Sequence, residues 1–287
     1  MEITCWGARG SIPVSGREYL RYGGDTTCLE VRGADGAVVV IDAGTGARRL
    51  GERLVRDGCL DISILFTHAH WDHLLGLPFF APLYAPGAAI DLYGAPMAQT
   101  SVREIVSQAM RPPYFPVQLE DVAAGLSFHG ACAETFAIGG ITITPVPLSH
   151  PNGGLGYKLQ EGGATFVFLT DNELGHRHEG GLGFEGYAAF CRGADLLVHD
   201  AEYTAEEAIA KRTWGHTSVD DAVRLALAAG VPSLGLFHHN QNRTDDGVDE
   251  LVAESQARAE RSGSGLRCFA AAQGMGLPVE PQGATSR

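Results

Sequence analysis

The sequence predicts an α/β protein in which two β-sheets form a sandwich and helices cover both outer faces. Short apolar runs typical of buried strands occur in both halves of the 287-residue chain, and amphipathic segments follow them in each half. The 38 glycines and 14 prolines indicate many tight turns between short elements. No segment resembles a linker between independent domains, so we expect one domain over residues 1–280 and a disordered tail over 281–287.

The first half of the chain begins with strands joined by turns. An Ala-Asp-Gly sequence at 34–36 is typical of a hairpin turn between two strands. Glycines at 44 and 46 indicate a tight passage from a strand into a helix, which could alternatively hold an anion on its backbone amides. Strands are expected at 2–6, 28–32, 37–41, 62–66 and 90–93, and helices at 47–56 and 97–110.

The second half alternates strands with capped helices. Thr204 and Glu207 are spaced as in a capping box, and Ser218 is a suitable N-cap for the following helix. Strands are expected at 141–146, 157–159, 165–169, 194–198 and 234–237, with an edge strand at 266–271. Helices are expected at 204–211, 219–229 and 247–261. The chain thus has two β-rich halves, each with its own helices.

The composition of the chain argues against two classes of binding partner, long nucleic acids and membranes. The formal net charge of −13 argues against a long nucleic acid, because proteins that grip a polyanion are usually basic. No apolar run is fit to span a bilayer and the N-terminus does not resemble a signal peptide, so we expect a cytoplasmic protein with no membrane partner. The six cysteines are scattered without a CxxC pair and are predicted to be reduced core thiols. A homodimer is left open.

Four metal-binding side chains follow the buried strand at 62–66. His68, His70, Asp72 and His73 fall within six residues, and imidazoles and carboxylates are the ligands that zinc and similar divalent ions accept. His68 and His70 are two apart, so they point the same way in an extended segment. A histidine-rich surface loop is the plainer alternative, but this spacing of mixed ligands after a strand favours a metal site.

The pattern His68-x-His70-x-Asp72-His73 resembles the signature of the metallo-β-lactamase-fold superfamily. The resemblance implies a four-layer αββα sandwich and a site for two divalent ions. It places His68, His70 and His150 on one ion, Asp72, His73 and His238 on the other, and Asp171 between them. His239 is the alternative to His238, and Asp42 is expected to support the metal loop from behind. Zn²⁺ is the expected metal, with Mn²⁺ or Fe²⁺ as alternatives.

Two later segments indicate the chemistry. The segments at 195–203 and 215–218 resemble the His-Glu-Ala-Thr and His-Ser-Thr segments of the superfamily's phosphodiesterase branch, which includes ribonuclease Z. This resemblance implies that His216 contacts the scissile phosphate or protonates the leaving oxygen, and that Asp200, which stands where ribonuclease Z has glutamate, orients it. With the metal ligand Asp72, these are the expected catalytic residues. The alternative for His216 is a helix-start residue that bonds only to backbone.

The expected activity is dinuclear metal-dependent hydrolysis of a small phosphodiester, by a hydroxide that bridges the two ions. The openings at 6–13, 22–28 and 41–46 resemble bacterial cyclic-nucleotide phosphodiesterase-like proteins, so a cyclic nucleotide is the expected substrate. The Pro-rich loop 111–117 is either a lid, in which Tyr114 or Phe115 stacks a base, or a wall of the core. The alternatives are a carbon-centre hydrolase such as a lactonase or β-lactamase, a ribonuclease Z-like enzyme, and a non-catalytic module.

Overall fold

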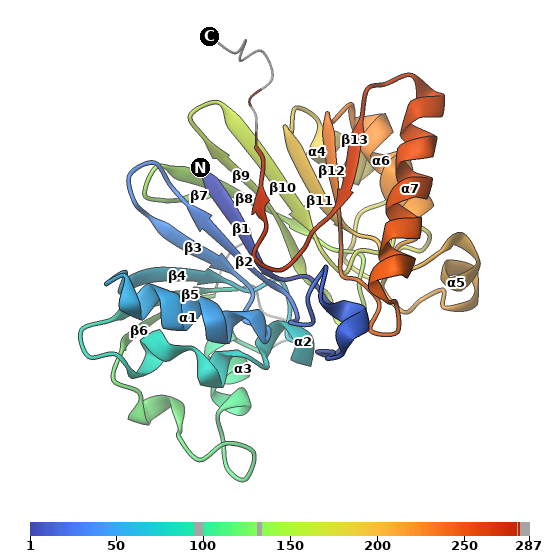
Figure 1. Ribbon diagram of the computed structural model, residues 1–287. Coiled ribbons are helices and arrows are strands. Elements are labelled where there is room, and N and C mark those ends of the chain that lie inside the picture. Colours follow the sequence, from blue (N-terminus) through green and yellow to red (C-terminus); the bar gives the residue numbers. More distant parts are fainter. Residues whose placement is uncertain (95–99, 131–133, 280, 282–287) are drawn as a thin grey trace.

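The computed structural model describes residues 1–94, 100–130, 134–279 and 281. These residues form two seven-stranded sheets that face each other (Figure 1). In spatial order the first sheet contains β14 (Gly276–Leu277), β1 (Glu2–Gly7), β2 (Cys28–Arg32), β3 (Val38–Ile41), β4 (Asp61–Leu65), β5 (Ala89–Tyr93) and β6 (Gly125–His129). The second contains β13 (Arg267–Ala270), β12 (Ser233–Phe237), β11 (Leu196–Asp200), β10 (Ala164–Leu169), β9 (Leu155–Glu161), β8 (Ile141–Pro147) and β7 (Phe136–Ile138).

Helices cover the outer faces of both sheets. Figure 1 shows α1 and α3 beside the first sheet, and α4, α6 and α7 beside the second. The helices are α1 (Gly46–Arg56), α2 (Trp71–Leu74), α3 (Val102–Ala109), α4 (Phe184–Cys191), α5 (Ala205–Ala210), α6 (Val219–Ala229) and α7 (Asp245–Ser262). No helix among the described residues has both the length and the apolar character needed to cross a membrane.

The alternation of side chains along the strands explains the layers. In β3, Val38 and Val40 pack with α1 on the outer side, whereas Val39 and Ile41 pack between the sheets. Successive residues of a strand point to opposite faces, so an uninterrupted apolar strand serves two cores at once. The strand β10 does the same from the second sheet: Val167 belongs to the outer core beside α4 and α6, and Phe168 to the core between the sheets.

The predicted fold class is confirmed, with differences at individual elements. The capping box of Thr204 and the N-cap of Ser218 are present. The helix predicted at 97–110 begins only at Val102, where Ser101 caps it, and residues 97–99 lie outside the described part of the chain. The strands β6, β7 and β14 and the helix α4 were not predicted from the sequence. Residues 282–287, most of the predicted tail, are also outside the described residues.

The strand order brings distant segments to one edge of the sandwich. Strands β3 to β6 are parallel, and so are β10 to β13. Loops at the carboxyl ends of parallel strands lie together at one edge, where ligands of α/β proteins usually bind. The metal-binding loop follows β4, and Asp171 and His238 follow β10 and β12. The fold therefore gathers these residues from both sheets.

Candidate metal centre

The seven side chains predicted as metal ligands come together in the structure. Their donor atoms form two groups, within each of which all atoms lie within 4.8 Å of one another, and Asp171 belongs to both groups. The first group is His68, His70, His150 and Asp171, and the second is Asp72, His73, Asp171 and His238. The arrangement matches the predicted division of the ligands, with Asp171 in the position of a bridge.

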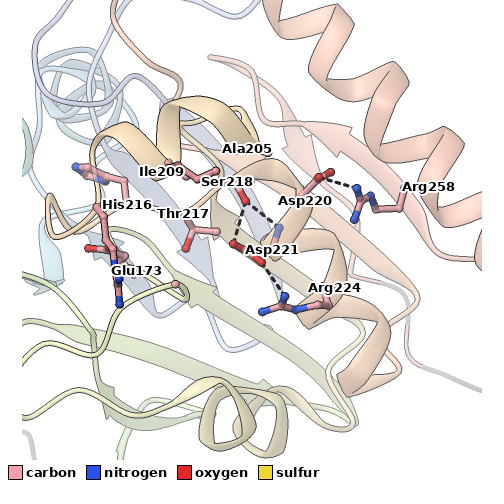
Figure 2. A pocket seen from close by; sticks show the side chains of 13 residues that line it. Glu173, Ala205, Ile209, His216, Thr217, Ser218, Asp220, Asp221, Arg224 and Arg258 are labelled. Atoms are coloured by element: carbon pink, nitrogen blue, oxygen red, sulfur yellow. Dashed lines mark hydrogen bonds and ion pairs between the residues drawn. The ribbon is translucent and has the colours of Figure 1, made fainter.

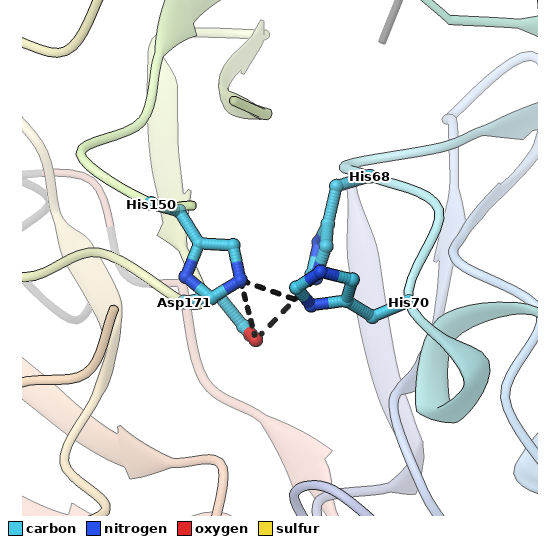
Figure 3. Close-up of side chains that lie close together, drawn as sticks. All are labelled: His68, His70, His150 and Asp171. Atoms are coloured by element: carbon cyan, nitrogen blue, oxygen red, sulfur yellow. Dashed lines mark hydrogen bonds and ion pairs between the residues drawn. The ribbon is translucent and has the colours of Figure 1, made fainter. Parts of the chain in front are cut away.

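The first group has the spacing of metal ligands. Nδ1 of His70 lies 3.1 Å from Nε2 of His150, and Nε2 of His68 lies 3.5 Å from Oδ2 of Asp171. Two ligands of a tetrahedral zinc ion at about 2.0–2.1 Å are about 3.3 Å apart. Figure 3 shows His68 and His70 reaching in from one side and His150 and Asp171 from the other.

The second group is more deeply buried. Nε2 of His238 lies 3.0 Å from Oδ2 of Asp72 and 3.3 Å from Oδ1 of Asp171, and Nε2 of His73 lies 3.3 Å from the same Asp171 oxygen. The N-terminal loop closes this group, because the backbone N–H of Ser11 donates to Oδ2 of Asp72 at 2.8 Å. Loops from both sheets and the N-terminus thus surround the second group.

Two buried histidine nitrogen atoms indicate that the two groups of side chains can bind metal ions. Nε2 of His68 and Nε2 of His73 are buried and have no hydrogen-bond partner among the described residues. A buried polar atom without a partner costs about 1–3 kcal/mol, so native proteins rarely keep one without a reason. Both atoms point at Asp171, where an ion would give each of them a partner. The residues therefore fit two divalent metal ions.

The protonation states of the first group agree with this use. Burial lowers the pKa of His150 to about 3 and, together with nearby His73, lowers the pKa of His68 well below its ordinary value. Both imidazoles are therefore neutral, which is the form that binds a metal. Burial raises the pKa of Asp171, but His238, His73 and His68 more than offset this effect and hold it well below the usual range. In the second group, burial lowers the pKa of His73 and of His238, but the surrounding carboxylates more than offset this effect and raise both pKa values well above the ordinary value.

Two buried carboxylates orient the ligands from behind. Oδ2 of Asp42 lies 2.8 Å from Nδ1 of His73, and Asp42 also accepts the backbone N–H of Thr67 at 2.7 Å. Oε2 of Glu202 lies 3.0 Å from Nδ1 of His238. A carboxylate that holds the second ring nitrogen fixes the tautomer and direction of a ligating histidine. Asp42 takes the expected supporting place, whereas the role of Glu202 was not predicted from the sequence, although Glu202 follows Asp200 by two residues.

Three site residues adopt a left-handed backbone. Asp42, Asp171 and His238 have φ angles of 60°, 47° and 59°. Each stands just after the end of a strand, where the chain must turn sharply to aim a side chain into the edge of the sandwich. Residues other than glycine rarely adopt such angles, and they cluster at functional sites that the surrounding structure holds in place.

The neighbouring residue His239 faces away from the metal groups. Its Nε2 donates to the carbonyl of Ala271 at 2.8 Å, and its ring contacts Tyr22 edge-on. Burial lowers the pKa of His239 to about 3. His238, and not the adjacent His239, is therefore the candidate metal ligand.

His216 stands beside both metal groups and is held by a carboxylate. Its Nδ1 lies 3.0 Å from Oδ2 of Asp200 and 3.5 Å from Oε2 of Glu202, and its ring stacks on His238 with centroids 4.7 Å apart. Asp200 thus reaches His216 although its side chain is one methylene shorter than glutamate. Burial lowers the pKa of His216, but the two carboxylates more than offset this effect and raise it to about 9. Both contacts use Nδ1, so the second ring nitrogen, Nε2, takes part in neither of them.

A buried glutamate holds the loop that carries His216. Oε1 of Glu173 accepts the backbone N–H of Thr213 at 2.8 Å, and Oε2 accepts that of Gly215 at 2.9 Å. The carbonyl of Gly215 in turn lies 3.0 Å from Nδ1 of His150. The same short loop therefore contacts the metal-ligand candidate His150 and carries His216. The role of Glu173 was not predicted from the sequence.

A cavity of about 600 Å³ lies among α5, α6 and α7, on the outer side of His216 (Figure 2). Its wall contains two internal ion pairs, Arg224 with Asp221 at 3.2 Å and Arg258 with Asp220 at 2.6 Å. Figure 2 shows the ring of His216 directed away from these pairs. Because these charges neutralise one another and the ring faces elsewhere, we assign this cavity no part in the site.

Comparison with known proteins agrees with this geometry. A family model described as Beta-lactamase superfamily domain matches residues 38–239. The chain is 25% identical to a ribonuclease Z of Kineococcus radiotolerans over 98% of this chain and 96% of the relative. The fold is similar to that of the metallo-β-lactamase fold protein YhfI from Bacillus subtilis, with a TM-score of 0.70 at 16% identity and coverage of 96% and 98%. A diphosphatase of the PhnP family has a TM-score of 0.65 at 21% identity, with 98% of each chain covered.

The family model covers most of the chain, including all seven predicted ligands. The chain therefore belongs to the β-lactamase superfamily, as the histidine and aspartate pattern predicted. The ribonuclease Z relative falls in the phosphodiesterase branch that the segments around Asp200 and His216 indicated.

Proposed function

We propose that this protein is a dinuclear metal-dependent phosphodiesterase that hydrolyses a small phosphodiester, with a cyclic nucleotide as the best-fitting substrate. The pair of His216 and Asp200 beside the two metal groups carries the proposal. Their ring and carboxylate atoms are 3.0 Å apart, and His216 also contacts the ligand candidate His238. A hydrolase acting on carbon needs no such additional proton donor, whereas a phosphodiesterase must protonate a poor leaving oxygen.

The position of each side chain determines which of the two metal ions it is proposed to bind. His68, His70 and His150 are proposed to hold one ion and Asp72, His73 and His238 the other, with Asp171 shared. Two ions held there would supply an activated water and neutralise the charge that develops on the phosphoryl oxygens.

The remaining residues act around this centre. Asp42 and Glu202 keep His73 and His238 in the orientation their hydrogen bonds define. Asp200 holds the His216 ring by Nδ1, so that Nε2 can deliver a proton to the leaving oxygen. General acid catalysis of this kind increases the reaction rate by about 10²–10⁴-fold.

The relatives support the class of enzyme. The family model matches residues 38–239, and a protein named ribonuclease Z matches 98% of the chain. A solved diphosphatase of the PhnP family has the same fold. Together with the two clusters of histidines and aspartates, these findings support a metal-dependent phosphoric diester hydrolase. Zn²⁺ is our choice of metal because the ligands are histidines and carboxylates, and Mn²⁺ or Fe²⁺ would fit the same donors.

A ribonuclease Z-like activity on RNA is the second candidate, favoured by the name of the relative that covers 98% of this chain. The charge of the protein weighs against it. The formal net charge is −13, and binding to a long polyanion depends on many lysine and arginine contacts to phosphates. We therefore place the small phosphodiester first.

A panel of substrates tests the proposal. Zn²⁺-loaded and Mn²⁺-loaded protein is assayed with cyclic mono- and dinucleotides, bis(p-nitrophenyl) phosphate, a precursor transfer RNA and p-nitrophenyl acetate. We expect turnover of the phosphodiesters. Cleavage of the transfer RNA at a far higher kcat/KM than any small diester would favour the second candidate. Turnover of the acetate ester alone would favour a carbon-centre hydrolase.

The His216→Ala variant separates the chemistry of phosphorus from that of carbon. We expect kcat for the cyclic nucleotides to fall about 10²–10⁴-fold, because their ribose leaving oxygen loses its proton donor. Ester hydrolysis and the release of p-nitrophenolate, a good leaving group that needs no proton, should change much less. His129→Ala is the matched control, because His129 is half exposed on β6 and pairs with Asp91. Equal losses on cyclic nucleotide and ester in His216→Ala would contradict the proposed role.

A further inference from the structure

We propose that a cavity beside the metal-binding loop binds the planar base of the substrate, with Trp71 and Tyr114 as its aromatic walls. The proposal rests on the phosphodiesterase function above and narrows the substrate to phosphodiesters that contain a nucleoside.

The cavity borders the segment that carries the metal ligands. It has a volume of about 270 Å³, and Ala69 and Trp71, the two neighbours of His70, line it together with residues of α3 and the loop that follows α3. Pockets for whole small-molecule ligands usually measure about 300–1,000 Å³. This cavity therefore has room for one ring system of a ligand rather than for the whole molecule.

The cavity and the metal groups lie on opposite faces of the same short helix. Trp71 and Leu74 of α2 are three residues apart and share a face, and both line the cavity. Asp72 and His73 of the same helix are buried in the second metal group. His70 links the two sites, because it belongs to the first metal group and both of its chain neighbours line the cavity. A nucleotide whose phosphate lies at the first group would direct its base toward this cavity.

The aromatic walls are exposed but held in place. The side chain of Trp71 is 62% exposed and that of Tyr114 is 72% exposed. Large aromatic side chains that lie exposed side by side can mark a surface that binds a ligand or another protein. The backbone N–H groups of Tyr114 and Phe115 both donate to the carbonyl of Arg111, at 3.0 and 3.1 Å. The Phe115 ring packs edge-on against Phe79, with centroids 5.5 Å apart. In loop 111–117, Phe115 thus packs against the hydrophobic core, whereas the Tyr114 side chain lines the cavity and is exposed to a ligand.

The chemistry of the lining suits a base attached to a phosphate. Bases stack on aromatic rings with little regard to sequence, and one stacked base changes affinity by about 5- to 140-fold. Arg111 carries the single charge among the described residues of the lining, and Gln108 provides a side-chain amide. A guanidinium stacks on rings and attracts phosphates. In a protein with a net charge of −13, a cation at this position favours an anionic ligand with a flat ring.

Two substrates with the same leaving group test the cavity. Thymidine 5′-(p-nitrophenyl phosphate) contains a base, methyl p-nitrophenyl phosphate does not, and both release p-nitrophenolate. In Tyr114→Ala we expect KM for the thymidine ester to rise about 5- to 140-fold, with kcat/KM for the methyl ester within twofold of the parent protein. Tyr114→Phe retains the ring and should restore KM. Leu20→Ala is the control, because Leu20 is 77% exposed and lines a different cavity.

Calorimetry gives a readout that does not depend on turnover. Thymidine 5′-monophosphate is titrated into the Zn²⁺-loaded parent protein, Tyr114→Ala and Tyr114→Phe. We expect weaker binding in Tyr114→Ala alone, and equal affinity in all three would overturn the cavity proposal even if both esters are hydrolysed. Should neither ester be hydrolysed, the phosphodiesterase function fails, and the titration still decides whether Tyr114 contacts a base.

Discussion

A single methyl group at Gly10 is predicted to expel the ion of the second metal group. Gly10 lies in the N-terminal loop, and its backbone N–H donates to the carbonyl of His239 at 3.0 Å. A Cβ atom built at this position would lie 2.2 Å from Nδ1 of His238 and 2.3 Å from its Cε1. The φ angle of Gly10 is open to alanine, so Gly10→Ala changes the contact without imposing backbone strain.

The size of the effect follows from these distances. To reach an ordinary contact of 3.4 Å, the His238 ring or the loop must move by about 1.2 Å, the difference between 3.4 and 2.2 Å. Metal–ligand bonds tolerate only about 0.2 Å. Overpacking a buried site costs about 1–3 kcal/mol, and a misplacement of about 1 Å at a catalytic site costs about 10²-fold in rate. His238 would also lose its 3.0 Å contact with Glu202.

Metal content measures the outcome directly. Mass spectrometry of the native protein should find two Zn²⁺ per chain in the parent and close to one in Gly10→Ala, with kcat/KM reduced about 10²-fold. Gly276→Ala is the matched control, because a Cβ there meets nothing within 4 Å. A Gly10→Ala protein that keeps both ions and full activity would refute the placement of His238 at the second ion.

Three further changes probe the same site. Asp42→Ala removes the carboxylate that holds His73, and we expect zinc affinity to fall about 10- to 100-fold in a competition titration with a chelator. Glu202→Gln keeps the shape of the side chain but removes the charge facing His238, so zinc affinity should fall by less; an increase would contradict the supporting role. Removal of metal with EDTA should lower the melting temperature, and Zn²⁺ at 100 times its Kd should restore about 2.7 kcal/mol. A melting temperature that EDTA leaves unchanged would argue against a resident metal.

The sequence was sufficient to predict those elements whose pattern lies in neighbouring residues. Apolar runs such as 62–66 and 165–169 form buried strands, because a strand with cores on both faces needs apolar side chains at most of its positions. Capping residues such as Thr204 mark helix starts, because their side chains satisfy backbone N–H groups a few residues away. The edge strand β7 and the helix α4 were missed, since the half-exposed residues of β7 and the weak amphipathicity of α4 leave little periodicity to read.

The sequence by itself therefore determined the family, the two-sheet sandwich and the set of candidate ligands around His68 and His70, because strand patterning and ligand spacing are written in neighbouring residues. Only the tertiary structure decided how these residues meet. It turned His238 rather than His239 toward Asp72 and set Asp200 within reach of His216. It also placed Glu202 behind His238, and Tyr114 with Trp71 around one cavity. These contacts join residues far apart in the chain through strand order and left-handed turns, which no local pattern specifies.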